Sequence, residues 1–123
     1  MATLNDRVFD NGLTVLDTEA NRIDITSQEA TSYAEATSTY TLGNSTSLSI
    51  GAPQDRSGGG REVVVAAITD GSVTGTGTET HYAIVDTSNS RLLATGSLTA
   101  SQSVTSGNTF TLSSVAIGIP DPA

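Results

Sequence analysis

The chain has 123 residues, a length that suits one domain with a modest hydrophobic core. It contains no Cys, which excludes disulfide bonds and any chemistry that needs a thiolate. Thirteen acidic residues against five Arg give a net charge of −8, which disfavours direct binding to nucleic acid and favours solubility.

The N-terminal stretch 1–12 is predicted to be an arm or a short helix, because Thr3 can cap a helix that Gly12 would end. Beyond it the hydrophobic pattern changes its period. Leu13–Leu16 and Arg22–Thr26 are predicted to be strands, and the second alternates cleanly between apolar and polar residues.

The middle of the chain is rich in turn-forming residues. Gln28–Thr37 is expected to be a loop with one helical turn. Ser47–Ile50 alternates as a short strand does. Ala52–Gly60 contains a Pro and three consecutive Gly, which is typical of a flexible surface loop.

The second half has the stronger strand pattern. Glu62–Thr69 contains a nearly continuous apolar run, so we expect a central strand with its Val63–Ile68 run in the interior. Thr80–Asp86 alternates, which places Tyr82 and Ile84 on one face of a strand. The other face is expected to carry His81, Ala83 and Val85. Three further strands are predicted at Arg91–Leu98, Thr109–Ser113 and Val115–Ile119.

Short strands at this spacing indicate an all-β, mainly antiparallel fold. We expect a β-sandwich or a small barrel with a short N-terminal helix, formed by a single β-rich domain over residues 1–123. No segment is apolar over the length that a membrane span requires, and the first residues do not resemble a secretory signal.

The residues offer little sign of catalytic chemistry. His81 is the sole His, and Asp86 follows it by five residues on the same predicted strand, so the two side chains are expected on opposite faces. A Ser–His–Asp triad is therefore disfavoured, and His81 is interpreted as a half-exposed strand residue. The sequence contains no Gly-x-Ser-x-Gly motif.

Four carboxylates lie fairly close in the sequence and are candidates for a glycosidase pair or a calcium site: Asp17, Glu19, Asp24 and Glu29. Their spacing does not match a calcium-binding loop, and the chain has few aromatic residues to line a sugar-binding cleft. We interpret them as solvated surface acids. No catalytic residue, metal site or cofactor is expected, and a small hydrolase is the third hypothesis.

Several segments together resemble the small Ser/Thr-rich virion proteins of tailed bacteriophages, which are often encoded near the major capsid gene. The segments that carry this resemblance are Ser27–Thr37, Tyr40–Asn44, Val65–Gly71, His81–Asp86, Leu92–Leu98 and Ile117–Pro120. They cover most of the chain but are strands and turns, so no catalytic residue is transferred.

The resemblance implies a structural role in the virion, as a capsid decoration (cement) protein on the outer surface of the head. The implied partner is the major capsid protein, and a second copy of the chain on the capsid is a further candidate. The implied location is the virion surface, and the host cytoplasm during assembly. A tail or fibre component is the alternative, since such modules share this composition.

Two segments offer candidate capsid contacts. In the N-terminal stretch, Leu4, Val8 and Phe9 are apolar on an element that so small a core is not expected to bury fully. In the glycine-rich loop, Arg56 and Arg61 are able to form bidentate bonds with capsid carboxylates.

Overall fold

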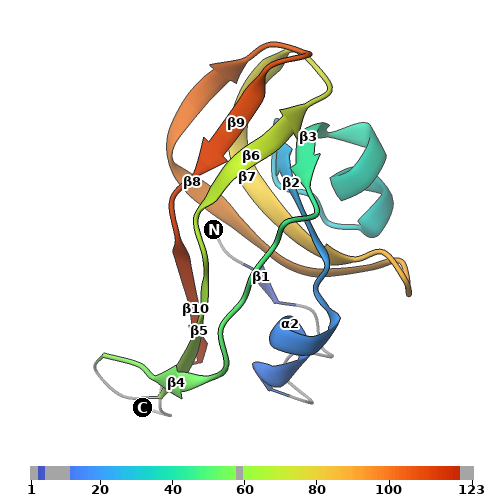
Figure 1. Ribbon diagram of the computed structural model, residues 1–123. Helices are drawn as coiled ribbons and strands as arrows, with labels where there is room; N and C mark the ends of the chain where they lie inside the picture. Colours follow the sequence, from blue (N-terminus) through green and yellow to red (C-terminus); the bar gives the residue numbers. More distant parts are fainter. Residues whose placement is uncertain (1–2, 5–11, 58–59, 120–123) are drawn as a thin grey trace.

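The computed structural model describes residues 3–4, 12–57 and 60–119. This part of the chain is mainly β, as the sequence predicted, and forms two antiparallel sheets (Figure 1). The strands are β1 Thr3–Leu4, β2 Arg22–Thr26, β3 Thr41–Ser45, β4 Gln54–Asp55, β5 Arg61–Val65, β6 Ile68–Val73, β7 Gly77–Asp86, β8 Arg91–Val104, β9 Thr109–Leu112 and β10 Val115–Ile119. The helices are α2 Thr14–Glu19 and the π-helix η1 Glu35–Thr39.

Seven strands form a strongly curled sheet in the order β1-β8-β7-β2-β3-β6-β9, and three form a small sheet in the order β10-β5-β4. The curled sheet is a half-barrel, and the small sheet continues from β6 and β9 at its lower end (Figure 1). Both sheets contribute to one hydrophobic core, in which Val63 and Ile117 of the small sheet join Ile23, Ile25 and Ile84 of the curled sheet. Of the two predicted architectures, the structure is closer to an open barrel than to a sandwich.

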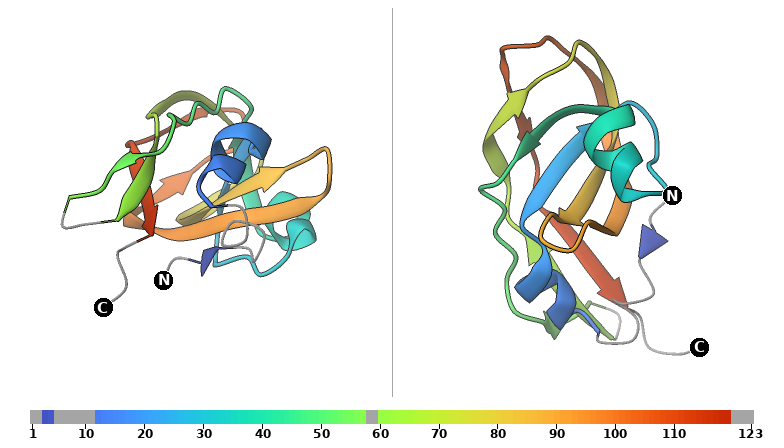
Figure 2. Two further views of the ribbon diagram at one scale, coloured as in Figure 1. Left: turned by 90° about the horizontal axis from the view of Figure 1, so that it is seen from below. Right: turned by 90° about the vertical axis from the view of Figure 1, so that its right-hand side faces the viewer.

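The central strand β7 is buried on both faces. Tyr82 and Ile84 belong to the main core, whereas Ala83 and Val85 belong to a second cluster on the outer face, as the alternation of Thr80–Asp86 predicted. The segment around η1 covers that outer face, where Ala36 packs against the second cluster (Figure 2). The expected helical turn within Gln28–Thr37 is therefore present, although the helical segment runs from residue 33 to Thr39.

Two predictions near the N-terminus are wrong. Thr3 does not begin a helix, because Thr3–Leu4 is the strand β1 and pairs with β8 at Thr95 and Ala94. Residues 5–11 of the predicted arm lie outside the described residues.

Leu13–Leu16 is not a strand either, since the helix α2 begins at Thr14. Leu13 and Leu16 are buried at a spacing of three while Asp17 is exposed, so the run forms one buried face of a helical turn. A four-residue segment with three apolar residues fits either the strand or the helical period, and here the helical period is correct.

The predicted central strand Glu62–Thr69 is two strands. β5 ends at Val65 in the small sheet and β6 begins at Ile68 in the curled sheet, with both alanines between them exposed. The chain changes sheets at this point, while Val63, Val65 and Ile68 remain buried as expected. An uninterrupted apolar run in the sequence does not show where the chain bends from one sheet to the other.

The preceding segment also differs from its prediction. Ser47–Ile50 is not a strand, since Ile50 forms only an isolated bridge with Val65. The predicted loop Ala52–Gly60 contains the short strand β4, which pairs with β5.

The C-terminal half follows the prediction closely. β7 and β8 form a hairpin through Thr87–Ser90, and Ser90 adopts a positive φ of 53° at the turn. β8 continues to Val104, six residues beyond the predicted end at Leu98. β9 and β10 occupy their predicted positions within one residue.

Candidate functional site

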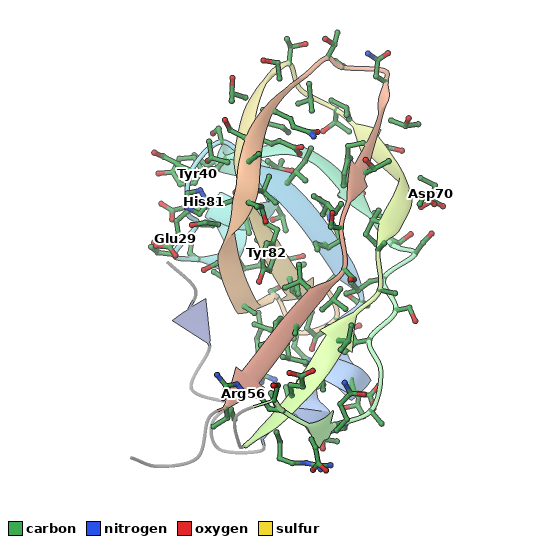
Figure 3. The ribbon with its side chains drawn as sticks, turned by 90° about the vertical axis from the view of Figure 1, so that its left-hand side faces the viewer. Glu29, Tyr40, Arg56, Asp70, His81 and Tyr82 are labelled. Carbon is green, nitrogen blue, oxygen red and sulfur yellow. The ribbon has the colours of Figure 1, made fainter. Side chains whose placement is uncertain are left out.

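The curled sheet does not close on itself, and a cavity of about 230 Å³ lies at the opening. The lining includes residues of β8 on one side and of the β9–β10 segment on the other. Figure 3 looks onto this side, with β8 and the β9–β10 segment flanking the labelled Tyr82. We call it the seam cavity; its aliphatic walls and two titratable groups come from Ile23, Ile68, Leu98, Leu112, Glu79 and Tyr82.

Glu79 is the most unusual residue of the seam cavity. Its side chain is only 1% exposed, and within the described part of the chain its Oε2 atom has no hydrogen-bond partner. Burial raises the pKa of the Glu79 carboxyl above its ordinary value, because the charged form loses its hydration. Buried polar groups in proteins nearly always have a partner, so an orphaned carboxylate oxygen beside a cavity marks a candidate site.

An irregularity in strand pairing places Glu79 there. Glu79 lies opposite Gln102 and His81 lies opposite Ser97, so one intervening residue on β7 faces four on β8. The extra residues lie on β8, and at this irregularity Glu79 and Tyr82 of β7 are both buried whereas the two residues between them are half-buried, so burial does not alternate here. Glu79 consequently lines the same cavity as Tyr82, three residues later.

Tyr82 forms part of the floor of the seam cavity. Its side chain is 6% exposed, and burial raises the pKa of its hydroxyl. The ring lies across β8 at Gly96, where an added Cβ atom would approach the hydroxyl oxygen to 2.5 Å. A glycine at this position is therefore what leaves room for the ring and holds the phenol beside the cavity.

Replacing Glu79 by Met is expected to increase the free energy of unfolding at pH 7 by about 1–2 kcal/mol, because Met fills a similar volume without an unpaired polar group. The folded protein binds the Glu79 proton more tightly than the unfolded chain does. The contribution of Glu79 to the stability is therefore greatest below the ordinary Glu pKa and falls as the pH rises through the raised pKa of the folded state.

Urea denaturation between pH 4 and pH 8 tests this expectation. The Met variant should lack the loss of stability with rising pH that Glu79 causes in the parent. Glu62→Gln is the matched control, since Glu62 lies on β5 outside the cavity lining and its replacement removes the same charge. Equal stability of the Met variant and the parent at every pH would show that the Glu79 carboxylate is solvated.

A second polar cluster, on β2 and β3, is fully paired. Asp24 is buried and accepts hydrogen bonds from Arg22 Nε at 2.7 Å, Arg22 Nη2 at 2.9 Å and Thr41 Oγ1 at 2.6 Å. Burial raises the pKa of Asp24, and these three bonds oppose that rise. The cluster fixes β2 against β3 and leaves no carboxylate oxygen for a ligand.

The other candidate carboxylates from the sequence are dispersed. Glu19 lies 3.6 Å from Arg91, Glu29 accepts a hydrogen bond from Thr95, and Asp17 is exposed on α2. Among the described residues, no group of three or more acidic or His side chains is placed to hold a metal ion.

His81 and Asp86 have separate partners. The Nδ1 atom of His81 lies 2.8 Å from Thr80 Oγ1, whereas Asp86 is buried and accepts hydrogen bonds from the Ser88 amide and Asn89 Nδ2. The carboxylate of Asp86 thus shapes the β7–β8 turn.

The structure places Arg56 and Arg61, two of the predicted contact residues, outside the lining of the seam cavity. Arg61 donates to Asp55 Oδ1 at 2.6 Å and to the Pro53 carbonyl at 3.0 Å, so it fastens β4 to β5. The side chain of Arg56 lies against Gly118 of β10. Leu4 is on β1, where only the backbone is described, and Val8 and Phe9 lie outside the described residues.

Glu79 was not among the candidates taken from the sequence. Strict alternation would place it on the same face as His81, and nothing in the local sequence marks the bulge. The one available signal is an acid that precedes the apolar stretch Tyr82–Val85 on a strand whose second half is buried.

Of the helices in the part of the chain that the structure describes, none has the length and apolar character needed to span a bilayer. Comparison of the chain with models of protein families, with curated proteins and with solved structures gave no match.

Proposed function

We propose that this protein is a non-enzymatic structural component of a tailed-phage virion, a decoration protein that binds the outer surface of the capsid and stabilises the head. The resemblance of its strand and turn segments to small virion proteins supports this role. So does the observed architecture, a small antiparallel β fold with a net charge of −8. The proposed partner is the major capsid protein.

The observation that best supports a binding role is the state of the sheet edges. β9 is the last strand of the curled sheet, and the half of β8 beyond Ser97 extends past its pairing with β1. Neither β9 nor residues 98–104 of β8 contain a charged residue or a Pro. Soluble proteins usually protect exposed edges with charges, Pro or bulges. The irregularity in the pairing with β7 interrupts the β8 edge between Ser97 and Gln102, whereas β9 and the end of β8 are uncharged and rich in Ser and Thr, which suits pairing with a partner's strand.

Decoration of a capsid also suits weak individual contacts. Many copies on a symmetric shell multiply a modest interface between the decoration protein and neighbouring capsid subunits. The N-terminal contacts from Leu4, Val8 and Phe9 and the loop contacts from Arg56 and Arg61 remain part of the proposal. Arg61 would have to exchange its bond with the exposed Asp55 for one with the capsid, a small cost for a surface ion pair.

The function is tested by binding to undecorated capsids and by copy number in purified virions. We expect saturable binding and a copy number close to that of the capsid protein, and a few to some dozens of copies would favour the tail instead. Ser101→Lys/Thr109→Lys places charges on the two edges and should weaken capsid binding at least tenfold, since charged side chains block strand pairing.

Ser38→Lys/Thr46→Lys is the matched control, because it makes the same two exchanges at exposed residues that lie on neither β8 nor β9. Each variant is first checked for native folding by circular dichroism. If both double variants bind like the parent, the edges do not form the interface, and the Arg56→Glu/Arg61→Glu variant then tests the loop. Absence of the protein from virions would refute the role altogether.

A further inference from the structure

We propose that the seam cavity binds a primary alkylammonium group, with the Glu79 carboxylate as its counter-charge. The proposal stands on the coincidence of a cavity of about 230 Å³ with a carboxylate that is 1% exposed and lines it. It is independent of the proposed role on the capsid.

The orphaned oxygen defines the kind of group that would bind. An ionised carboxylate only accepts hydrogen bonds, so its missing partner is a donor. Within the described residues, Oε2 is the one buried side-chain atom that lacks a partner. A single free acceptor suits the compact charge of an ammonium better than the planar fork of a guanidinium, which needs two parallel acceptors.

Part of the lining suits an alkyl stem, and the remainder carries polar side chains such as Ser97, Thr99 and Gln102. Ile23, Ile68, Leu98 and Leu112 provide aliphatic surface beside Glu79. The volume is below that of most drug-binding pockets, which fits one short chain and not a large ligand. A metal ion is disfavoured, because hard cations require several oxygen ligands and the lining contains one carboxylate.

Both the net charge of the protein and the charge of the cavity favour a cationic ligand. The net charge of −8 attracts cations to the protein and repels anions. Among the lining residues, which belong to strands of both sheets and their connections, Glu79 and Tyr82 are the titratable groups. A protonated Glu79 would therefore release its proton to the solvent when the ammonium group binds, leaving a paired carboxylate and cation. Binding should strengthen as the pH rises from 4 to 8, while the amine stays protonated.

Titration of the ¹⁵N-labelled full chain with n-butylammonium chloride, followed by NMR, tests the proposal. We expect saturable shifts at cavity residues such as Leu98 and Leu112, and an affinity at least tenfold weaker in Glu79→Gln. The neutral isostere n-butanol should bind at least tenfold more weakly to the parent. Glu62→Gln, which removes one charge outside the cavity, should bind like the parent.

Calorimetry on the parent keeps the test independent of the folding of Glu79→Gln. Titrations in two buffers with different ionisation enthalpies should show release of up to about one proton per bound amine near the raised pKa of Glu79. Cavity shifts that are absent, or equal for butylammonium and butanol, would overturn the proposal. So would unchanged binding by folded Glu79→Gln.

A further titration distinguishes two sources of the ammonium group. Nα-acetyl-lysine N-methylamide carries the same group on a peptide unit. If it binds with the affinity of butylammonium, the cavity admits the lysine side chain of a partner protein. If only butylammonium binds, the natural ligand is a free small amine. Either result supports the site, and binding by neither refutes it.

Discussion

Val65→Asp is expected to destabilise the protein by about 3–5 kcal/mol, a large part of the stability of a small domain. Val65 is 2% exposed and belongs to the main core. It pairs with Val115 of β10, bridges Ile50 and belongs to the lining of the seam cavity, so a carboxylate there would lose most of its hydration. Thermal and urea denaturation measure the loss.

Ala66→Asp is the matched control, because the adjacent residue is exposed where the chain leaves β5. It introduces the same charge one position along the chain and should change the free energy of unfolding by less than about 0.5 kcal/mol. Equal effects of the two substitutions would show that the small sheet does not pack against the curled one. A Val65→Asp variant that unfolds like the parent would place the core elsewhere.

The sequence predicts a strand well where apolar side chains recur at every second position over five or more residues. Arg22–Thr26 and Thr80–Asp86 are such segments, and both are central strands of the curled sheet. In β7 the alternation even separates the two cores, since Ile84 and Val85 pack in different clusters. The periodicity is a direct consequence of strand geometry, so local sequence suffices.

Prediction fails where tertiary context decides between equal local alternatives. The short run Leu13–Leu16 suits a helix or a strand, and packing of Leu16 into the main core selects the helix. The run Val63–Ile68 is buried as predicted at Val63, Val65 and Ile68, but it conceals a change of sheet at two alanines that are exposed. Residue type indicates burial, whereas the position of the bend depends on which distant strands pair with the β5 part and with the β6 part of the run.

The candidate site could not be predicted from the sequence for a similar reason. The cavity exists because β8 and the β9–β10 segment, which pair with different strands, stand apart at the open seam. Glu79 lines it through a bulge that depends on the register of β7 with β8. The signal for an unpaired carboxylate is the absence of a partner, and only the folded arrangement reveals that absence.

The buried carboxylate and the open edges are both features that a fold optimised for stability alone would lack. Glu79 costs free energy wherever its charge is unpaired, and uncharged edges invite association. Both are explained if the protein meets a partner or ligand at the seam. The two proposals therefore place function on the same side of the molecule, although each is tested separately.

Gly43→Ala is expected to destabilise the protein by about 3 kcal/mol through overpacking of backbone against backbone. A Cβ atom at this position would overlap the Ser72 carbonyl oxygen of β6 and come within 3.0 Å of Val73 Cα. β3 is unable to move away, because β2 pairs with it on the opposite side at Ile25. Removing the overlap between the added Cβ atom and β6 would require separating strands in the middle of the curled sheet.

Gly75→Ala provides the control, since its added Cβ atom would meet the Leu42 side chain at 3.6 Å, an ordinary contact distance. Both substitutions add one methyl group to glycines near the β3–β6 pair, so differences between them report the backbone overlap alone. Urea denaturation should show a midpoint far below that of the parent for Gly43→Ala and one near that of the parent for Gly75→Ala. Equal midpoints for the two variants would mean that β3 and β6 are not paired as described, and that the curled sheet ends at β3.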